Sequence, residues 1–175
     1  MAGYDSFTRV EGMSMDLSLP VASRIEIDEV CKRTKSTLQA MLNLLCPPDV
    51  TVESSNVNGG SLGAVGDTLR FQVDGTGDVS LMVIDLPFDE SMPHLKQPTA
   101  VITAGSRTSL SHVSAIAVAI ALGQILSSDI TDDALLLSSE PEINPTMLLD
   151  KIRLRNEQSD PLSASEELLH ALDLI

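Results

Sequence analysis

The stretch LRFQVDGTGDVSLMV, residues 69–83, predicts a β-hairpin. Leu69, Phe71 and Val73 alternate with polar residues, which is the period of a strand that buries one face. Residues 74–77 contain two glycines, which tolerate the positive φ of a tight turn. The returning strand carries apolar residues on both faces, so we expect it to be central in the sheet and covered on both sides.

Weaker patterns on either side of the hairpin predict the other strands and loops. Alternation over residues 13–19 favours an edge strand that stops at Pro20. The apolar run at 100–104 predicts a strand, and the glycine-rich stretch at 54–67 predicts a mobile loop. Further segments are a short strand at 49–53, a proline-containing loop at 86–98 and a run at 134–137 that could be a strand or a helical turn.

Helical spacing of apolar residues predicts four helices. The longest, from Ser109 to about Ser127, is apolar on most sides, so it should pack on the sheet and be covered on its other face. Thr108 or Ser109 would be its N-cap. The other helices are expected from Asp28 to the pair Pro47-Pro48, over 147–152 with Asn144 as N-cap and Pro145 as first residue, and over 168–175 behind a capping box at 163–166.

Together these elements predict one α+β domain at residues 16–175, after a flexible segment at residues 1–15. We expect a mainly antiparallel sheet of about four to five strands. An N-terminal helix, a long buried central helix and two C-terminal helices should pack on it.

The composition limits the kinds of partner. The chain has 175 residues and a formal net charge of −14, and 2% of its residues are aromatic. This charge repels a phosphate backbone, and aromatic platforms for stacking bases are scarce, so we expect no nucleic-acid partner. The same charge favours association with a basic protein through long-range steering.

The cysteines and the apolar segments bear on the cellular compartment. Cys31 and Cys46 lack the spacing of a metal or redox site, and we expect both to be small buried residues with free thiols, which suits the cytoplasm. Residues 1–15 lack the basic start and apolar run of a secretory signal. Residues 108–128 carry no formal charge, but polar residues interrupt them, so we expect a buried helix and no membrane association.

The segment GSRTS, residues 105–109, leads from a strand into the long helix and is the first candidate site. Free N–H groups and the helix dipole favour an anion there, and the guanidinium of Arg107 could hold a carboxylate or a phosphate. The segment lacks the Walker pattern and the nucleophile elbow, and ordinary capping beside a surface arginine is the alternative. The candidate anion-binding residues are Ser106, Arg107, Thr108 and Ser109.

A second candidate pocket combines the same helix entrance with carboxylates further along the chain. Ser109 and His112 can touch on one helix face. An aspartate from residues 129–133 could orient the histidine, so His112, Asp132 and Asp133 are candidates for a small hydrolase or anion-binding pocket around residues 105–112. The histidines lack metal-ligand spacing, and we expect neither a metal nor a cofactor.

Several segments of the C-terminal half carry a resemblance to a known group of proteins. They are VITAGSR at 101–107, an alanine-rich helix at 115–126, DITDD at 129–133 and PTMLL at 145–149. Their arrangement is similar to small α+β immunity-type domains of bacterial polymorphic toxin systems and to related uncharacterised bacterial families. The resemblance implies a cytosolic acidic protein that occludes a basic toxin surface without doing chemistry.

The leading hypothesis is a non-catalytic acidic domain that binds a basic protein partner in the cytoplasm. The first alternative is an acidic secretion-chaperone-like dimer that holds an extended effector segment, and the second is the hydrolase or anion-binding pocket. Both binding hypotheses predict a sizeable apolar surface patch with an acidic rim. An unpaired outer strand would favour the addition of a partner's strand.

Overall fold

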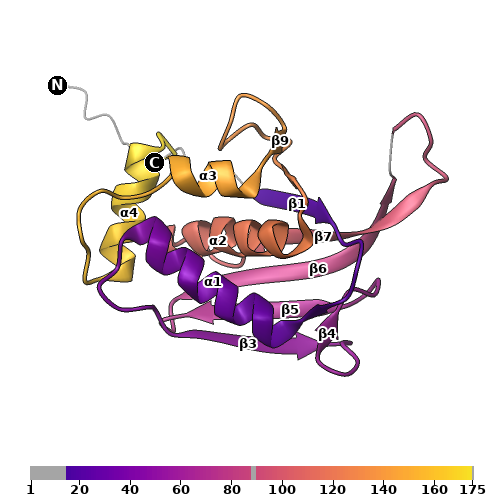
Figure 1. Cartoon of the computed structure of the whole chain (residues 1–175), viewed down its shortest axis with the longest axis horizontal. Helices are drawn as coiled ribbons and strands as arrows, with labels where there is room; N and C mark the ends of the chain where they lie inside the picture. Colours follow the sequence, from indigo (N-terminus) through magenta and orange to yellow (C-terminus); the bar gives the residue numbers. More distant parts are fainter. Residues whose placement is uncertain (1–14, 88–89, 175) are drawn as a thin grey trace.

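In the computed structural model, which describes residues 15–87 and 90–174, a seven-stranded antiparallel sheet packs against a layer of helices (Figure 1). The order of the described strands is β3-β5-β6-β7-β1-β8-β9. Their bounds are β1 (Asp16–Pro20), β3 (Val50–Ser55), β5 (Thr68–Val73), β6 (Gly77–Pro87), β7 (Lys96–Ala104), β8 (Ile130–Thr131) and β9 (Glu142–Ile143). A separate small sheet pairs β2 (Ile25–Glu26) with β4 (Ser61–Leu62).

The predicted α+β class and mainly antiparallel sheet are confirmed, but the expected strand number is wrong. The described chain has a sheet of seven strands, whereas about four to five were expected. β8 and β9 have two residues each, too few to show alternation along the sequence. β1 is also no edge strand, because β8 pairs with it through Ser18 and Thr131. The expected flexible segment 1–15 lies outside the described residues except for Met15, which is buried.

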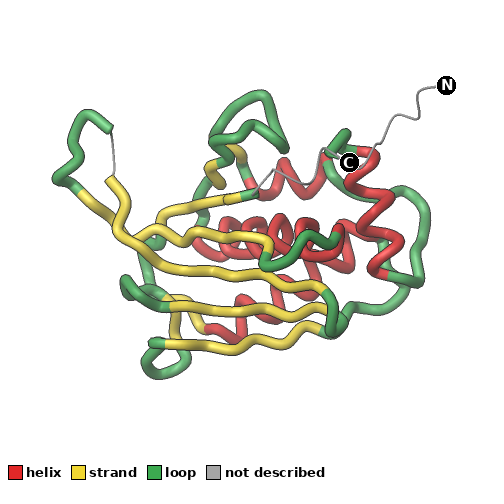
Figure 2. Tube along the Cα trace, turned by 180° about the vertical axis from the view of Figure 1, so that it is seen from behind, coloured by secondary structure: helices red, strands yellow, loops and turns green. Residues whose placement is uncertain are grey.

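The four helices of the described chain lie on one side of the sheet, behind the strands in Figure 2. They are α1 (Ile27–Leu42), α2 (Ser109–Leu126), α3 (Pro145–Lys151) and α4 (Pro161–Ala171). α2 packs on β6 and β7 and is covered by α1, α3 and α4, which confirms the predicted buried central helix. By length and composition α2 could cross a membrane, and 72% of it is buried inside the fold.

The helix starts follow local capping, with one correction. Asn144 caps α3 as predicted, because its side chain accepts hydrogen bonds from Thr146 N and Met147 N. For α4 the predicted capping box at Ser163 is wrong. Asp160 is the N-cap, and it accepts from both the backbone N–H and the hydroxyl of Ser163.

α1 ends before the prolines that were expected to stop it. Its last residue is Leu42, and Asn43 follows in the left-handed conformation with φ of 49°. The Asn43 N–H bonds to Gln39 O and closes the last turn. Pro47-Pro48 therefore lies beyond a helix that is already terminated.

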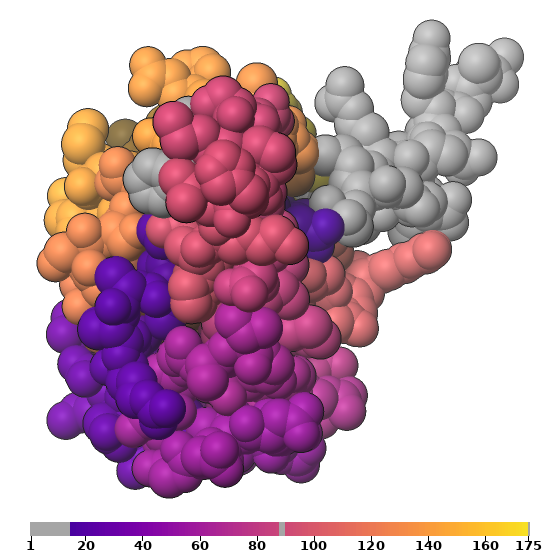
Figure 3. Space-filling view, turned by 90° about the vertical axis from the view of Figure 1, so that its right-hand side faces the viewer, coloured from indigo at the N-terminus to yellow at the C-terminus, as the bar shows by residue number. Residues whose placement is uncertain are grey.

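The segments expected to be loops are partly strands. β3 continues to Ser55, and β4 lies within the glycine-rich stretch where it pairs with β2. β6 and β7 pair as far as Pro87 and Lys96, so the expected loop at 86–98 begins and ends in strands that project from the sheet as a ribbon (Figure 1). Residues 90–95 between them form turns, as a loop would. Pro87 stands at a strand end, where no ladder bond is lost. Figure 3 is seen from this end, with the atoms of the ribbon at the front. Residues 134–137 form turns and bends between β8 and β9, neither a strand nor a helical turn.

The helices cover one face of the sheet and not the other. The hairpin residues Leu69, Phe71 and Leu81 are fully buried under the helices. On the opposite face, Met82 is 46% exposed. Figure 2 shows no described helix in front of the strands on this side of the sheet. The expectation that β6 is covered on both sides is therefore wrong, because the helices all pack on one side.

Candidate functional site

The entrance to α2 is occupied by hydroxyl groups of the chain itself. Thr108 is the N-cap, and its Oγ1 accepts a hydrogen bond from Ser111 N at 3.2 Å. The hydroxyls of Ser106, Thr108 and Ser111 lie 2.6–3.2 Å from one another. The fully buried Ser111 also accepts from Asp78 N at 2.8 Å. This network ties the first turn of α2 to the start of β6.

The predicted anion-binding residues therefore have different roles. Ser106 and Thr108 belong to the hydroxyl network, whereas Arg107 is exposed and Ser109 is half-buried in the first turn of α2. An anion at this helix entrance would have to share the two hydroxyls with Ser111. Anion binding here stays a prediction.

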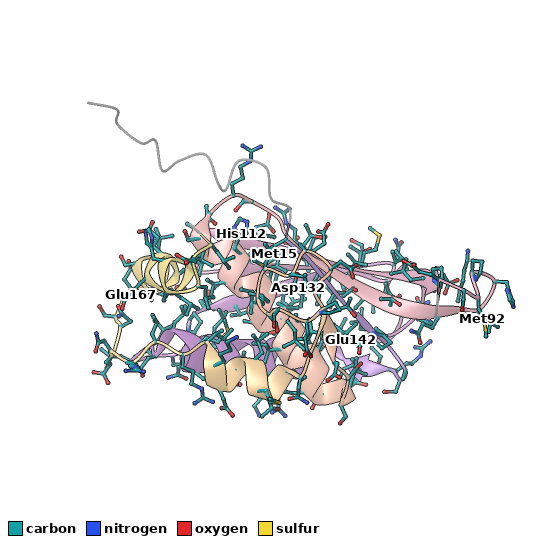
Figure 4. The ribbon with its side chains drawn as sticks, turned by 90° about the horizontal axis from the view of Figure 1, so that it is seen from above. Met15, Met92, His112, Asp132, Glu142 and Glu167 are labelled. Carbon is teal, nitrogen blue, oxygen red and sulfur yellow. The ribbon has the colours of Figure 1, made fainter. Side chains whose placement is uncertain are left out.

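The residues of the second candidate pocket lie on separate elements, His112 on α2 and Asp132 beyond β8 (Figure 4). His112 Nδ1 is 2.9 Å from Thr108 O, and Nδ1 is the donor because a carbonyl oxygen can only accept. Asp132 is fully buried, and its Oδ2 accepts from Leu137 N at 2.8 Å. Asp132 Oδ1 has no hydrogen-bond partner in the described chain, and Asp133 is exposed. His112 and Asp132 each contact a backbone group of their own segment.

Metal ligands do not gather in the part of the chain that the structure describes. Within residues 15–87 and 90–174, no group of three or more His, Cys, Asp and Glu side chains is placed to hold an ion. A site for a hard cation needs several converging oxygens. The acidic residues of the described chain are instead spread over strands, loops and helices.

Sequence reasoning missed a surface that we call the uncovered face. It consists of the side chains on the side of the sheet away from the helices. Cross-strand pairing aligns Glu53 with Arg70, and Arg70 with Ser80. Some of these residues line a hollow of about 370 Å³, namely Glu53, Ser55, Thr68, Arg70, Asp78, Ser80 and Gly105. Other residues of the uncovered face include Asp16, Ser18, Thr51, Gln72, Met82, Ile84, Val101 and Thr103.

An ion pair crosses the hollow. Arg70 Nε donates to Asp78 Oδ1 at 3.0 Å, and Arg70 Nη2 donates to Asp78 Oδ2 at 2.9 Å. This two-point geometry holds the planar guanidinium in one orientation. The hydrogen bond and the charge of Asp78 raise the pKa of Arg70, and the charge of Glu53 adds to this effect. Arg70 is 56% exposed at its side chain, so a docking molecule could reach the pair.

Asp78 joins this hollow to the helix entrance. Its carboxylate holds Arg70, its N–H donates to Ser111, and its carbonyl accepts from Gly105 N at 2.7 Å. A Cβ at position 105 would lie 2.7 Å from Asp78 Cγ. Glycine is therefore needed at position 105 for the carboxylate to lie against the backbone.

The centre of the uncovered face is apolar, but it is smaller than the sizeable patch that the binding hypotheses predict. Met82 is its most exposed apolar residue, and its neighbours Val101 and Ile84 are half-buried. Hydroxyl side chains surround this centre on the adjoining strands. The alternation of residues 69–73 contained the signal for this face, because it separates Arg70 and Gln72 from the core residues. The assumption that β6 is buried on both faces concealed it.

The two cysteines differ from the expectation that both are buried. Cys46 is exposed, because it follows the end of α1 where the chain leaves the core. Cys31 is half-buried, with its Sγ 3.5 Å from Val50 O. Burial raises the pKa of the Cys31 thiol, and the nearby Lys35 partly opposes this effect.

The geometry thus contains a helix entrance held by hydroxyls and an uncovered sheet face, joined at Asp78. Arg70 and Glu53 are exposed charged groups in the lining of the hollow. Compared with known proteins, the chain matches no family model, no curated protein and no solved structure.

Proposed function

We propose that this chain is a non-catalytic domain of the cytoplasm that binds a basic protein partner through the uncovered face. The observation that carries the proposal is the make-up of this face: an apolar centre at Met82 inside a surround of hydroxyls and carboxylates. Interfaces commonly combine an apolar centre with a polar rim that can form hydrogen bonds.

Charge favours a basic partner. The chain has a formal net charge of −14. On the uncovered face, Asp78 neutralises Arg70, and the carboxylate of Glu53 remains exposed beside them. Such a surface steers a positively charged protein toward it and repels a negatively charged one. Binding should therefore weaken as the salt concentration rises.

The contacts of the candidate catalytic groups support a role without chemistry. Thr108 caps α2 by accepting from Ser111 N, His112 Nδ1 donates to the carbonyl of Thr108, and Asp132 holds the loop between β8 and β9. These contacts hold His112 and one carboxylate oxygen of Asp132, two of the side chains that the hydrolase pocket would use. An immunity-type role, in which the domain occludes a basic toxin surface, is the form of this function that we propose.

Matched methionine substitutions test the proposal. The immobilised chain is used to capture proteins from the native lysate at low and high salt, and a captured protein is then purified and titrated against three forms of the domain. These forms are the wild type, Met82→Lys on the uncovered face and Met147→Lys on α3, where Met147 is 72% exposed. We expect a basic protein whose affinity falls at least about tenfold for Met82→Lys and stays unchanged for Met147→Lys. Equal affinity for all three forms, or no captured protein at low salt, would overturn the proposal.

A further inference from the structure

The two edges of the large sheet are protected to different degrees. β9 forms one edge with only two residues, and Pro141 and Pro145 flank it. β3 forms the other edge with six residues in unbroken register on β5. It contains neither proline nor lysine, and Glu53 is its one charged residue. Natural sheets usually block a long edge with such residues or with a bulge, because an open edge accepts another strand.

The outward peptide groups of β3 can be assigned from its pairing. Asp74 N donates to Asp49 O at 2.9 Å, and hydrogen-bonded pairs alternate along an antiparallel ladder. The pairs of Thr51 with Gln72 and of Glu53 with Arg70 therefore face inward. Val52 and Ser54 direct their N–H and C=O groups away from the sheet, and no described strand lies beyond them (Figure 1).

From this edge we infer that β3 accepts an extended segment of the partner as an eighth strand, an inference that rests on the proposed function. The side chains beside the edge define the segment. Glu53 is exposed on the uncovered face, and the half-buried Val52 lies at the border of the core on the opposite face. A strand in which basic and apolar residues alternate would pair its basic side chains with Glu53 and cover Val52.

Charge also disfavours a second copy of the chain at the edge of β3. Two copies would each bring a formal net charge of −14 to the interface. The groups near the edge are mainly acidic, with Asp28, Asp49, Glu53 and Asp74 against Lys35 and the paired Arg70. A basic segment gains from this field, whereas a second β3 strand is repelled by it.

Amide hydrogen exchange tests the inference with a defined probe. The probe is a capped peptide of about eight residues in which lysine alternates with valine, and its control replaces each lysine by glutamate. We expect the lysine peptide to slow the exchange of the Val52 and Ser54 amides several-fold, and the glutamate peptide to leave it unchanged. No slowing with either peptide would overturn the inference. If the exchange of these amides slows without peptide as the protein concentration rises, a second copy of the chain occupies the edge. That result would also overturn the inference.

Three variants sharpen this test. Ser54→Pro removes an outward N–H without removing a bond to β5, and Ser54→Ala keeps that N–H. Ser54→Pro should weaken the lysine peptide at least about tenfold, and Ser54→Ala should leave the affinity unchanged. Should Ser54→Pro fail to fold, Glu53→Lys decides the matter, because it should reverse the preference to the glutamate peptide.

The same variants separate this inference from the proposed function. The affinity for the purified partner is measured by titration. A loss of affinity with Met82→Lys but not with Ser54→Pro would contradict the eighth strand and would still support the binding function. A loss of affinity with both variants supports both the proposed function and the eighth strand. Full affinity with Met82→Lys would contradict the proposed function itself.

Discussion

Leu81 and Met82 are neighbours on β6, and they point to opposite faces of the same sheet. Leu81 is fully buried under the helical layer, whereas Met82 is 46% exposed on the uncovered face. The same contrast repeats on β5, where Phe71 is fully buried and Gln72 is exposed. The covered face is held by close packing of apolar side chains, whereas the uncovered face carries hydroxyl groups and the Arg70–Asp78 ion pair. An antiparallel sheet can keep one face in solvent while its other face packs on the core, and the described chain has this arrangement.

The largest expected change in stability comes from comparing alanine substitutions on the covered and the uncovered face. Leu81→Ala should lower the free energy of unfolding by about 2–5 kcal/mol, because it removes buried methyl groups and leaves a cavity. Met82→Ala should change it by less than about 0.5 kcal/mol, because exposed side chains contribute little to stability. Chemical denaturation of both variants measures the contrast. Similar losses for the two residues would mean that the face around Met82 is covered in solution.

Two glycines offer the next comparison, with the same substitution in each layer. A Cβ at position 123 in α2 would lie 2.9 Å from Pro145 Cγ and from Ser128 O, and neither of these groups can move easily. Gly123→Ala should therefore cost about 1–3 kcal/mol of unfolding free energy through overpacking. At position 105 the nearest atom is Asp78 Cγ at 2.7 Å, and that carboxylate can turn away. A smaller loss is expected for Gly105→Ala in thermal unfolding, and a ranking in the opposite order would contradict the rigid contact between α2 and α3.

Two buried serines of α2 test the link between the helical layer and the uncovered face. Ser111 accepts a hydrogen bond from Asp78 N, whereas the hydroxyl of Ser114 has no partner among the described residues. Ser111→Ala should cost roughly 1–2 kcal/mol of unfolding free energy, because it leaves the Asp78 N–H without its acceptor. Ser114→Ala should be neutral or slightly stabilising, since it removes an unsatisfied polar atom. Equal losses in urea unfolding would show that the Asp78 contact adds nothing.

The parts of the fold that were predicted from the sequence depend on local signals. The hairpin over Leu69 to Val83, the buried helix α2 and the Asn144 cap each follow from alternation, apolar content or a capping side chain within a few positions. β8 and β9 depend on pairing Ile130 with Ile143, which the intervening turn segment brings together. Such two-residue strands have no period of their own, so local reasoning could not find them.

The candidate site was harder to predict, for a different physical reason. Thr108 was correctly considered as a cap, but the hydrogen bond from Asp78 N to the hydroxyl of Ser111 joins residues far apart in the chain. The uncovered face was missed because cover is a tertiary property. Met82 and Leu81 are both apolar, and only the position of the helices makes one of them exposed. Alternation in the sequence indicates that the two faces of a strand differ, whereas the packing of the helices determines which face is uncovered.

The smallest expected effect concerns acid and the helical layer. Ser163 donates to Asp160 from its hydroxyl and its N–H, and these bonds lower the pKa of the Asp160 carboxyl. A carboxyl whose folded pKa is lowered stabilises the native state above its unfolded pKa of about 3.9. That contribution is lost as the pH falls through the lower folded value, so α4 should loosen in acid. Asp160→Asn keeps a capping oxygen without a titrating group, and it should retain α4 while removing this acid dependence. Amide exchange of Ala164 and Ser165, followed from neutral pH to below about pH 4, compares the two forms. The same acid response in Asp160→Asn would place its origin elsewhere in the molecule.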